Sequence, residues 1–143
     1  LVEQIGAKYF SKYDMSPQEL AEEVGNIDLV YEAVGGSEVA FDVLQVLGTN
    51  GIFVFTGIPA PETRLEIDSD ILMRRIVLEN LAIVGTVNAD RQAFEDAIAD
   101  LAEFKKRWPE TIKGVISGRF SVDDHEELLV GKSQGIKNVI AFS

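Results

Sequence analysis

Hydrophobic residues in this chain form two alternating patterns: short runs that are mostly apolar, and longer stretches with helical spacing. Three runs, at 27–34, 52–56 and 81–84, each lead into a glycine. Runs that are apolar on both faces are typical of strands in a parallel sheet that is covered by helices on both sides. The alternation of strand and helix therefore predicts an α/β fold, with 52–56 as its middle strand.

Helix start and stop signals separate these runs. Ser16 and Glu19 can form a capping box with Pro17 at the first helical position, which is a clear helix start. Either Asn88 or Asp90 is expected to cap the longest helix, and we expect the apolar stripe of that helix to be buried. The predicted helices are 16–24, 37–47 with Ser37 as its cap, 69–79 with Arg74 and Arg75 on its outer face, and 90–108.

Weaker patterns predict further elements. Ala7–Phe10 and Arg64–Asp68 are short stretches that we interpret as strands. The chain changes character near Lys113, where we place a boundary. The elements predicted beyond it are a strand over 115–122, a short helix over 123–130 and a final strand over 137–142.

Composition narrows the classes of protein and partner. The chain has 143 residues, is 46% hydrophobic and carries a net charge of -11, so we expect a globular protein that binds neither nucleic acid nor anionic membranes. It contains no cysteine, which excludes disulfides and fits a cytoplasmic protein. No apolar run approaches the ~20 residues of a membrane span. Because the chain starts at Leu1 rather than at a methionine, we expect it to be part of a longer protein.

Several familiar catalytic and phosphate-binding motifs are absent from the sequence. It contains no Gly-x-Gly-x-x-Gly, no Gly-x-Ser-x-Gly and no His-Glu-x-x-His. The segment 131–133 resembles the end of a P-loop, but it follows a predicted helix, so we reject that interpretation. His125 is the single histidine and is expected on the surface. Glu32 ends a predicted strand; it is either a general base or a partner of a helix terminus, and we assign it no catalytic role.

The ends of the three main strands are the best candidate for a binding site. If the strands are parallel neighbours, their carboxyl ends meet at one edge of the sheet, which is where ligands bind in open α/β folds. Small side chains, backbone groups and the Asn88 amide would suit the face of a flat ring better than proton transfer. Ordinary strand–loop junctions remain the alternative. The strand-end residues are Ala33, Val34, Gly35, Thr56, Gly57, Ile58, Thr86, Val87 and Asn88.

Four segments in order, 27–35, 50–59, 77–88 and 135–140, carry a family resemblance. Together they resemble the carboxyl-terminal half of the medium-chain zinc-dependent alcohol dehydrogenases, and most of all the archaeal-type glucose 1-dehydrogenases. The resemblance implies a partial Rossmann-type parallel sheet, strands 3 to 6 in the order 3-2-1-4-5-6. It also implies an incomplete NAD(P)-binding domain over 1–113 and a carboxyl-terminal return segment of the catalytic domain over 114–143.

The resemblance further implies that the intact protein oxidises the anomeric hydroxyl of an aldose with NAD or NADP. Lys137 matches a basic position that reaches the pyrophosphate, and Val34 stands where the family pattern has threonine. The residues that flank the nicotinamide in the family correspond here to Ala33, Val34, Thr56, Gly57, Ile58, Thr86, Val87 and Asn88.

The family's zinc ligands and most of its sugar contacts lie in an amino-terminal half that has no counterpart in these residues. We therefore predict that this chain alone binds no zinc and oxidises no sugar, while the intact enzyme uses zinc as a Lewis acid. Homo-oligomers are expected, with 81–88 as an edge for pairing. Two alternatives stay open: a stand-alone α/β module that binds a nucleotide or a partner, and another dehydrogenase of the same superfamily.

Overall fold

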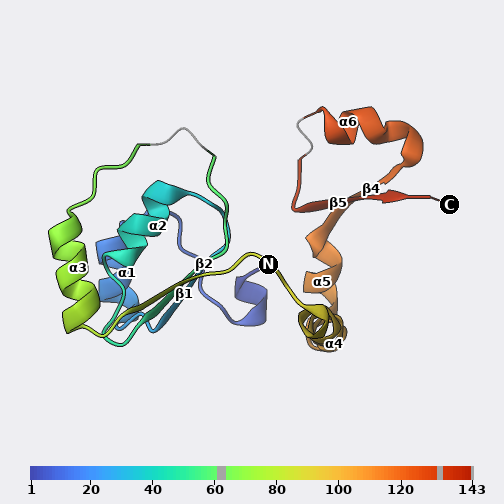
Figure 1. Ribbon diagram of the computed structural model, residues 1–143. Coiled ribbons are helices and arrows are strands. Elements are labelled where there is room, and N and C mark those ends of the chain that lie inside the picture. The colour runs from blue at the N-terminus through green and yellow to red at the C-terminus, as the bar shows by residue number, and fades with distance from the viewer. Residues whose placement is uncertain (61–63, 132–133, 143) are drawn as a thin grey trace. The chain divides into compact units, whose positions relative to one another are not determined.

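The computed structural model describes residues 1–60, 64–131 and 134–142 (Figure 1). Two residues of the rejected P-loop segment, Lys132 and Ser133, lie outside these ranges. The chain forms two compact units. We call Phe10–Asn88 the sheet unit, and Leu1–Tyr9 together with Ala89–Ser143 the terminal unit. The division into 1–113 and 114–143 concerns the domains of an intact enzyme, and it stays a prediction.

The predicted parallel sheet is present in the sheet unit. Its strands are β1 (Leu29–Glu32), β2 (Ile52–Phe55) and β3 (Ala82–Gly85). They are hydrogen-bonded neighbours in the order β1-β2-β3, and both pairs are parallel. The prediction of three adjacent parallel strands with 52–56 in the middle is therefore confirmed, and with it the α/β fold class.

The register of the sheet brings the three strand ends level with one another. Glu32 lies opposite Phe55, and Phe55 lies opposite Gly85. Each is the last residue of its strand. The backbone N–H of Thr56 donates to Glu32 O at 2.9 Å, and that of Thr86 donates to Phe55 O at 3.0 Å. The ladder thus continues one residue beyond β2 and one beyond β3, and it holds the loops that follow these strands in register.

The middle strand supplies the centre of a small hydrophobic core. Phe53 on β2 has no exposed surface, and its ring lies 4.6 Å from that of Phe55 between centroids. The buried residues packed with it lie on α2 (Ser37–Leu44), just after α2 and just before β3. The buried hydrophobic residues are Ala40, Leu44, Leu47, Phe53 and Leu81.

One face of the sheet is open, contrary to the expectation that helices cover both faces. Leu29, Tyr31 and Ile52 are exposed, whereas Val30 and Phe53, their neighbours along the strands, pack into the core. Successive side chains of a strand point to opposite faces. The described helices α2 and α3 (Ser69–Leu78) contribute side chains to the core on one face, so the second apolar face lacks a cover within the described residues.

Local sequence signals explain the helix starts. The Ser16 side chain accepts from Glu19 N at 3.3 Å and the Glu19 carboxylate accepts from Ser16 N at 2.8 Å, so the predicted capping box opens α1 (Pro17–Val24). The predicted cap Ser37 is wrong: Gly36 precedes α2 as its cap residue, and Ser37 is the first helical residue. The cap position lies one residue earlier because the loop after β1 already turns at Gly35, where φ is +78°.

Arg75 on α3 lies partly buried, not on the outer face as predicted. Its guanidinium donates to Leu47 O at 2.7 Å and also to Gln45 O, and it pairs with Glu79. The last carbonyls of a helix have no partner within the helix. Arg75 therefore donates to carbonyl groups that follow α2. The helical spacing of α3 does not reveal these long-range hydrogen bonds.

Two predicted strands are wrong. Ala7–Phe10 and Arg64–Asp68 have no regular secondary structure. A strand exists only with a hydrogen-bonded neighbour, and neither stretch pairs with one of the described strands. The described residues of the sheet unit therefore form three of the four strands that the resemblance implies.

The terminal unit contains a long helix and a two-stranded parallel sheet. Asp90, not Asn88, caps the long helix, since its side chain accepts from Ala93 N at 2.8 Å. Pro109 ends that helix and directly starts the next. The elements are η1 (Glu3–Ile5), α4 (Arg91–Arg107), α5 (Pro109–Val115), β4 (Ile116–Ser121), η2 (Val122–Asp124), α6 (His125–Leu129) and β5 (Lys137–Ala141), with β4 and β5 parallel.

The apolar stripe of α4 is largely exposed, so the expectation that it is buried is wrong for this chain. Phe94, Ile98 and Leu101 are exposed. Towards the carboxyl end, the rings of Phe104 and Trp108 lie 5.9 Å apart between centroids. A helix stripe of this width normally faces a core. None of the helices within the described residues is long and apolar enough to span a membrane.

Candidate functional site

Three exposed aliphatic side chains stand beyond the carboxyl ends of the parallel strands. Val34 follows β1, Ile58 follows β2 and Val87 follows β3, and their side chains are 89%, 77% and 70% exposed. The level strand ends place these three loops along one edge of the sheet. This is the edge at which ligands bind in open parallel sheets. The chain therefore presents apolar surface where a ligand is expected.

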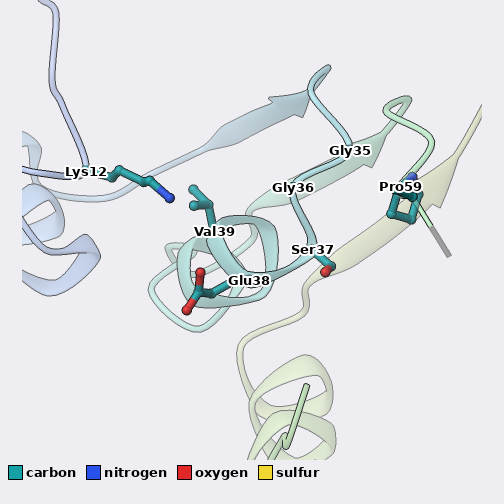
Figure 2. A pocket seen from close by; sticks show the side chains of 8 residues that line it. Lys12, Gly35, Gly36, Ser37, Glu38, Val39 and Pro59 are labelled. Atoms are coloured by element: carbon teal, nitrogen blue, oxygen red, sulfur yellow. The ribbon is translucent and has the colours of Figure 1, made fainter. Parts of the chain in front are cut away.

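The loops after β1 and β2 touch through their backbones. A Cβ atom built on Gly35 would lie 2.6 Å from the Ile58 carbonyl oxygen, and one built on Gly57 would overlap the backbone nitrogen of Gly35. The labelled positions of Gly35 and Pro59 in Figure 2 show the two loops side by side. Only glycine permits so close an approach, which explains why both loops carry one.

The carboxylate of Glu32 holds these two loops together. Its Oε1 accepts from Val34 N at 2.8 Å and from Gly35 N at 2.6 Å. Its Oε2 accepts from Gly57 N at 3.2 Å. These bonds, that from Gly35 first, lower the pKa of Glu32 below its ordinary value. A general base needs a pKa raised towards neutral pH, so the structure favours the second of the two interpretations, a partner of backbone N–H groups beside a helix start.

A hollow of about 230 Å³ opens beside the start of α2 (Figure 2). Gly35, Gly36 and Pro59 line it together with Lys12 and Glu38. A larger groove of about 480 Å³ runs along β1; Ala33 and Val34 line it. Lys12 borders both spaces, and sequence analysis did not single it out because it lies in an irregular segment with no motif.

Eight of the nine predicted site residues lie at this edge of the sheet. The five in the loops after β1 and β2 are joined through Glu32 and the contact of these loops. The other three follow β3. Thr56 donates its hydroxyl hydrogen to Glu32 O at 2.8 Å. Lys137, the ninth, is the first residue of β5 in the terminal unit. The eight are Ala33, Val34, Thr56, Gly57, Ile58, Thr86, Val87 and Asn88.

The edge suits the face of a flat ring better than a metal ion. Val34, Ile58 and Val87 offer apolar contacts, and Asn88 offers an amide that can both donate and accept. A nicotinamide ring with its carboxamide has that combination of a flat face and a polar group. Among the described residues no group of three or more His, Cys, Asp or Glu side chains is placed to hold a metal, and His125 is exposed with its Nδ1 3.0 Å from Val122 O.

Comparisons with known proteins identify the relatives of this chain. A family model described as the glucose dehydrogenase C-terminus matches residues 1–142. A glucose 1-dehydrogenase of Methanocella arvoryzae is 29% identical over 140 residues, which are 98% of this chain and 39% of that protein. One of Haloarcula marismortui is 36% identical over 103 residues, 72% of this chain and 29% of that protein.

Two solved structures of dehydrogenases also match this chain. The Haloferax mediterranei glucose dehydrogenase in complex with NADP, Zn and gluconolactone matches with a TM-score of 0.83 and 26% identity, over 99% of this chain and 39% of that one. An alcohol dehydrogenase of Thermotoga maritima matches in fold, with a TM-score of 0.76 and 19% identity over 96% of this chain and 38% of its own. The chain thus spans about two fifths of the length of the relatives that match nearly all of it.

Proposed function

Because this chain belongs to the glucose dehydrogenase C-terminus family, we propose that its sheet edge holds the nicotinamide of NAD or NADP in a sugar dehydrogenase. The observation that carries the proposal is the row of exposed Val34, Ile58 and Val87 at the level ends of three parallel strands. The relatives are glucose 1-dehydrogenases, and one related structure contains NADP, Zn and gluconolactone. An aldose is therefore the proposed substrate.

We assign the chain's residues to orientation of the cofactor. Val34, Ile58 and Val87 would line one side of the nicotinamide ring, and Asn88 would bind its carboxamide. Gly57 allows the ring to approach the backbone. Ala33, Thr56 and Thr86 complete the walls of the site, and Lys137 supplies a positive charge for the pyrophosphate.

The chemistry divides between the cofactor and the protein. A nicotinamide held at this edge would supply the hydride acceptor for the oxidation of the sugar. The described residues exclude water from one side of the ring and fix its orientation, because their side chains at the edge are aliphatic and their loops are tied by Glu32. They do not fit zinc, so we propose that zinc ligands and sugar contacts belong to other residues of the intact enzyme.

The uncovered apolar surfaces support the proposal that this chain is part of a larger assembly. The open face of β1 and the exposed stripe of α4 are apolar, and β3 is an exposed edge strand. Surfaces of this kind are usually covered in a stable protein. We propose that further domains cover the faces and that copies of the enzyme associate through β3. The cytoplasm stays the expected compartment on the grounds of the absent cysteine.

Replacing Asn88 by alanine tests the assignment of the polar contact. In the full-length protein, Asn88→Ala is expected to raise the KM for NAD or NADP about five- to tenfold, since a hydrogen bond contributes on the order of 1 kcal/mol. The measurement is sugar-dependent reduction of the dinucleotide at varied cofactor concentration.

Gln18→Ala is the matched control, because it removes an exposed amide from α1 in a different part of the sheet unit. Its KM and kcat are expected to stay at the wild-type values. An Asn88→Ala variant with unchanged KM and unchanged kcat contradicts the role that we give to Asn88.

A further inference from the structure

The carboxylate of Glu32 joins two loops that come from different strands. Val34 N and Gly35 N belong to the loop after β1, and Gly57 N belongs to the loop after β2. One side chain thus accepts from two neighbouring donors in one loop and from a third donor that lies more than twenty residues further along the chain. Backbone N–H groups are strong hydrogen-bond donors, and Glu32 provides an acceptor to both loops.

We propose that Glu32 is a positioning residue that sets the separation of the two loops between which the nicotinamide lies. The proposal rests on the proposed function, because it needs the ring to lie at this edge. Glu32 itself touches no reacting atom in this account. It acts through Val34 and Gly57, the residues that it binds and that we place against the ring.

The geometry of the loops leaves little room between their backbones. The two backbones approach so closely that a Cβ on Gly57 would lie 2.6 Å from Glu32 Oε2 and 2.7 Å from Gly35 Cα. Gly35 also has a φ of +78°, a conformation that costs other residues energy. Nothing in the hydrophobic core fixes this contact, because Val34 and Ile58 are exposed. Thr56 N, the Thr56 hydroxyl and Gly57 N also donate to the backbone oxygen of Glu32, which fixes the start of the loop after β2. The carboxylate adds the bonds that tie Val34 N and Gly35 N of the loop after β1 to the same residue.

The chemistry of a carboxylate matches this task. Each of its oxygens accepts hydrogen bonds, so Oε1 serves one loop and Oε2 the other. The lowered pKa of Glu32 shows that the ionised form is favoured. A glutamine in its place has one accepting oxygen and one NH₂ group, which would face a backbone donor on one of the loops. One loop then loses its bond to the side chain while the volume of the side chain hardly changes, although Gly57 N keeps its bond to the backbone oxygen of Glu32.

The test compares two ligands on the Glu32→Gln variant of the full-length protein. One ligand is the dinucleotide NAD or NADP, and the other is ADP-ribose or its 2′-phosphate, which lacks the nicotinamide. Calorimetric titration is expected to show about tenfold weaker binding of the dinucleotide, as for a lost charged hydrogen bond. Binding of the ADP-ribose ligand is expected to stay within about twofold of wild type. A general loss of structure would weaken both ligands equally.

Two further variants make the result specific. Glu22→Gln removes the same charge from an exposed position on α1 and is expected to bind both ligands as wild type does. Glu32→Asp keeps the charge but shortens the side chain by one methylene, and it is expected to weaken the dinucleotide more than the ADP-ribose ligand. This variant answers the question if Glu32→Gln fails to fold.

The outcomes separate this inference from the proposed function. Selective weakening of the dinucleotide supports both. Wild-type affinity of the Glu32 variants for the dinucleotide overturns the positioning role and leaves the proposed site intact, and equal weakening of both ligands overturns the positioning role in favour of a purely structural one. A wild-type protein that binds neither NAD nor NADP overturns both proposals.

Discussion

Replacing Phe53 by alanine is expected to lower the free energy of unfolding by about 3–5 kcal/mol. Phe53 is fully buried on the middle strand, and its ring contacts that of Phe55. The buried core consists of five hydrophobic residues including Phe53 itself, so a cavity at its centre has few neighbours that can move in to fill it. Because small domains are stable by only about 5–15 kcal/mol, this single change removes a large part of the stability.

Chemical denaturation of the 143-residue chain measures the effect. Tyr13→Ala is the control, because it removes an aromatic ring that is 89% exposed in the same unit; a change within about 0.5 kcal/mol is expected. The loss in free energy of unfolding for Phe53→Leu should lie between the losses for Phe53→Ala and Tyr13→Ala. If Phe53→Ala unfolds at the same denaturant concentration as Tyr13→Ala, β2 is not the centre of the core.

Replacing Gly57 by alanine is expected to have the largest effect on the cofactor site. The added Cβ overlaps the backbone nitrogen of Gly35 and lies 2.6 Å from Glu32 Oε2. Backbone cannot move aside as a flexible side chain can, so the loops after β1 and β2 must separate. Since a displacement of about 1 Å in a positioning element can cost on the order of 100-fold in rate, we expect a loss of that order in kcat/KM for the dinucleotide in the full-length protein.

Gly85→Ala is the matched control for this change. Gly85 ends β3, and a Cβ built on it meets nothing within 4 Å. The thermal midpoint of the Gly85→Ala protein is therefore expected to match that of the wild type, whereas the Gly57→Ala protein should unfold at a lower temperature. A Gly57→Ala protein with wild-type stability and wild-type kcat/KM contradicts the close approach of the two loops and their part in the site.

The sequence predicts those elements whose causes are local. The run 52–56 is apolar on both faces and lies between two predicted strands, so its place in the middle follows from the pattern. The capping box of Ser16 and Glu19 formed as expected. The carboxyl ends of the strands, once the strands are parallel, have to meet at one edge, and this placed the candidate site without any catalytic motif.

Predictions failed where the position of a residue depends on contacts with distant parts of the chain. Arg75 fits the outer face of α3 by spacing, yet it binds carbonyls beyond α2. Ala7–Phe10 has the composition of a strand but no neighbour to pair with among the described strands. The stripe of α4 has the spacing of a buried face but is exposed in this chain. Glu32 ends a strand as many acids do, and only the positions of Gly35 and Gly57 reveal its three partners.

Sugar-dependent reduction of NAD or NADP, by the full-length protein and by the 143-residue chain side by side, tests the central claim most directly. The absorbance of the reduced nicotinamide follows the reaction, with glucose and other aldoses as substrates. The account predicts reduction by the full-length protein and none by the chain alone, which lacks a metal cluster among its described residues. Turnover by the chain alone, or no reduction by the full-length protein with any aldose, would contradict it.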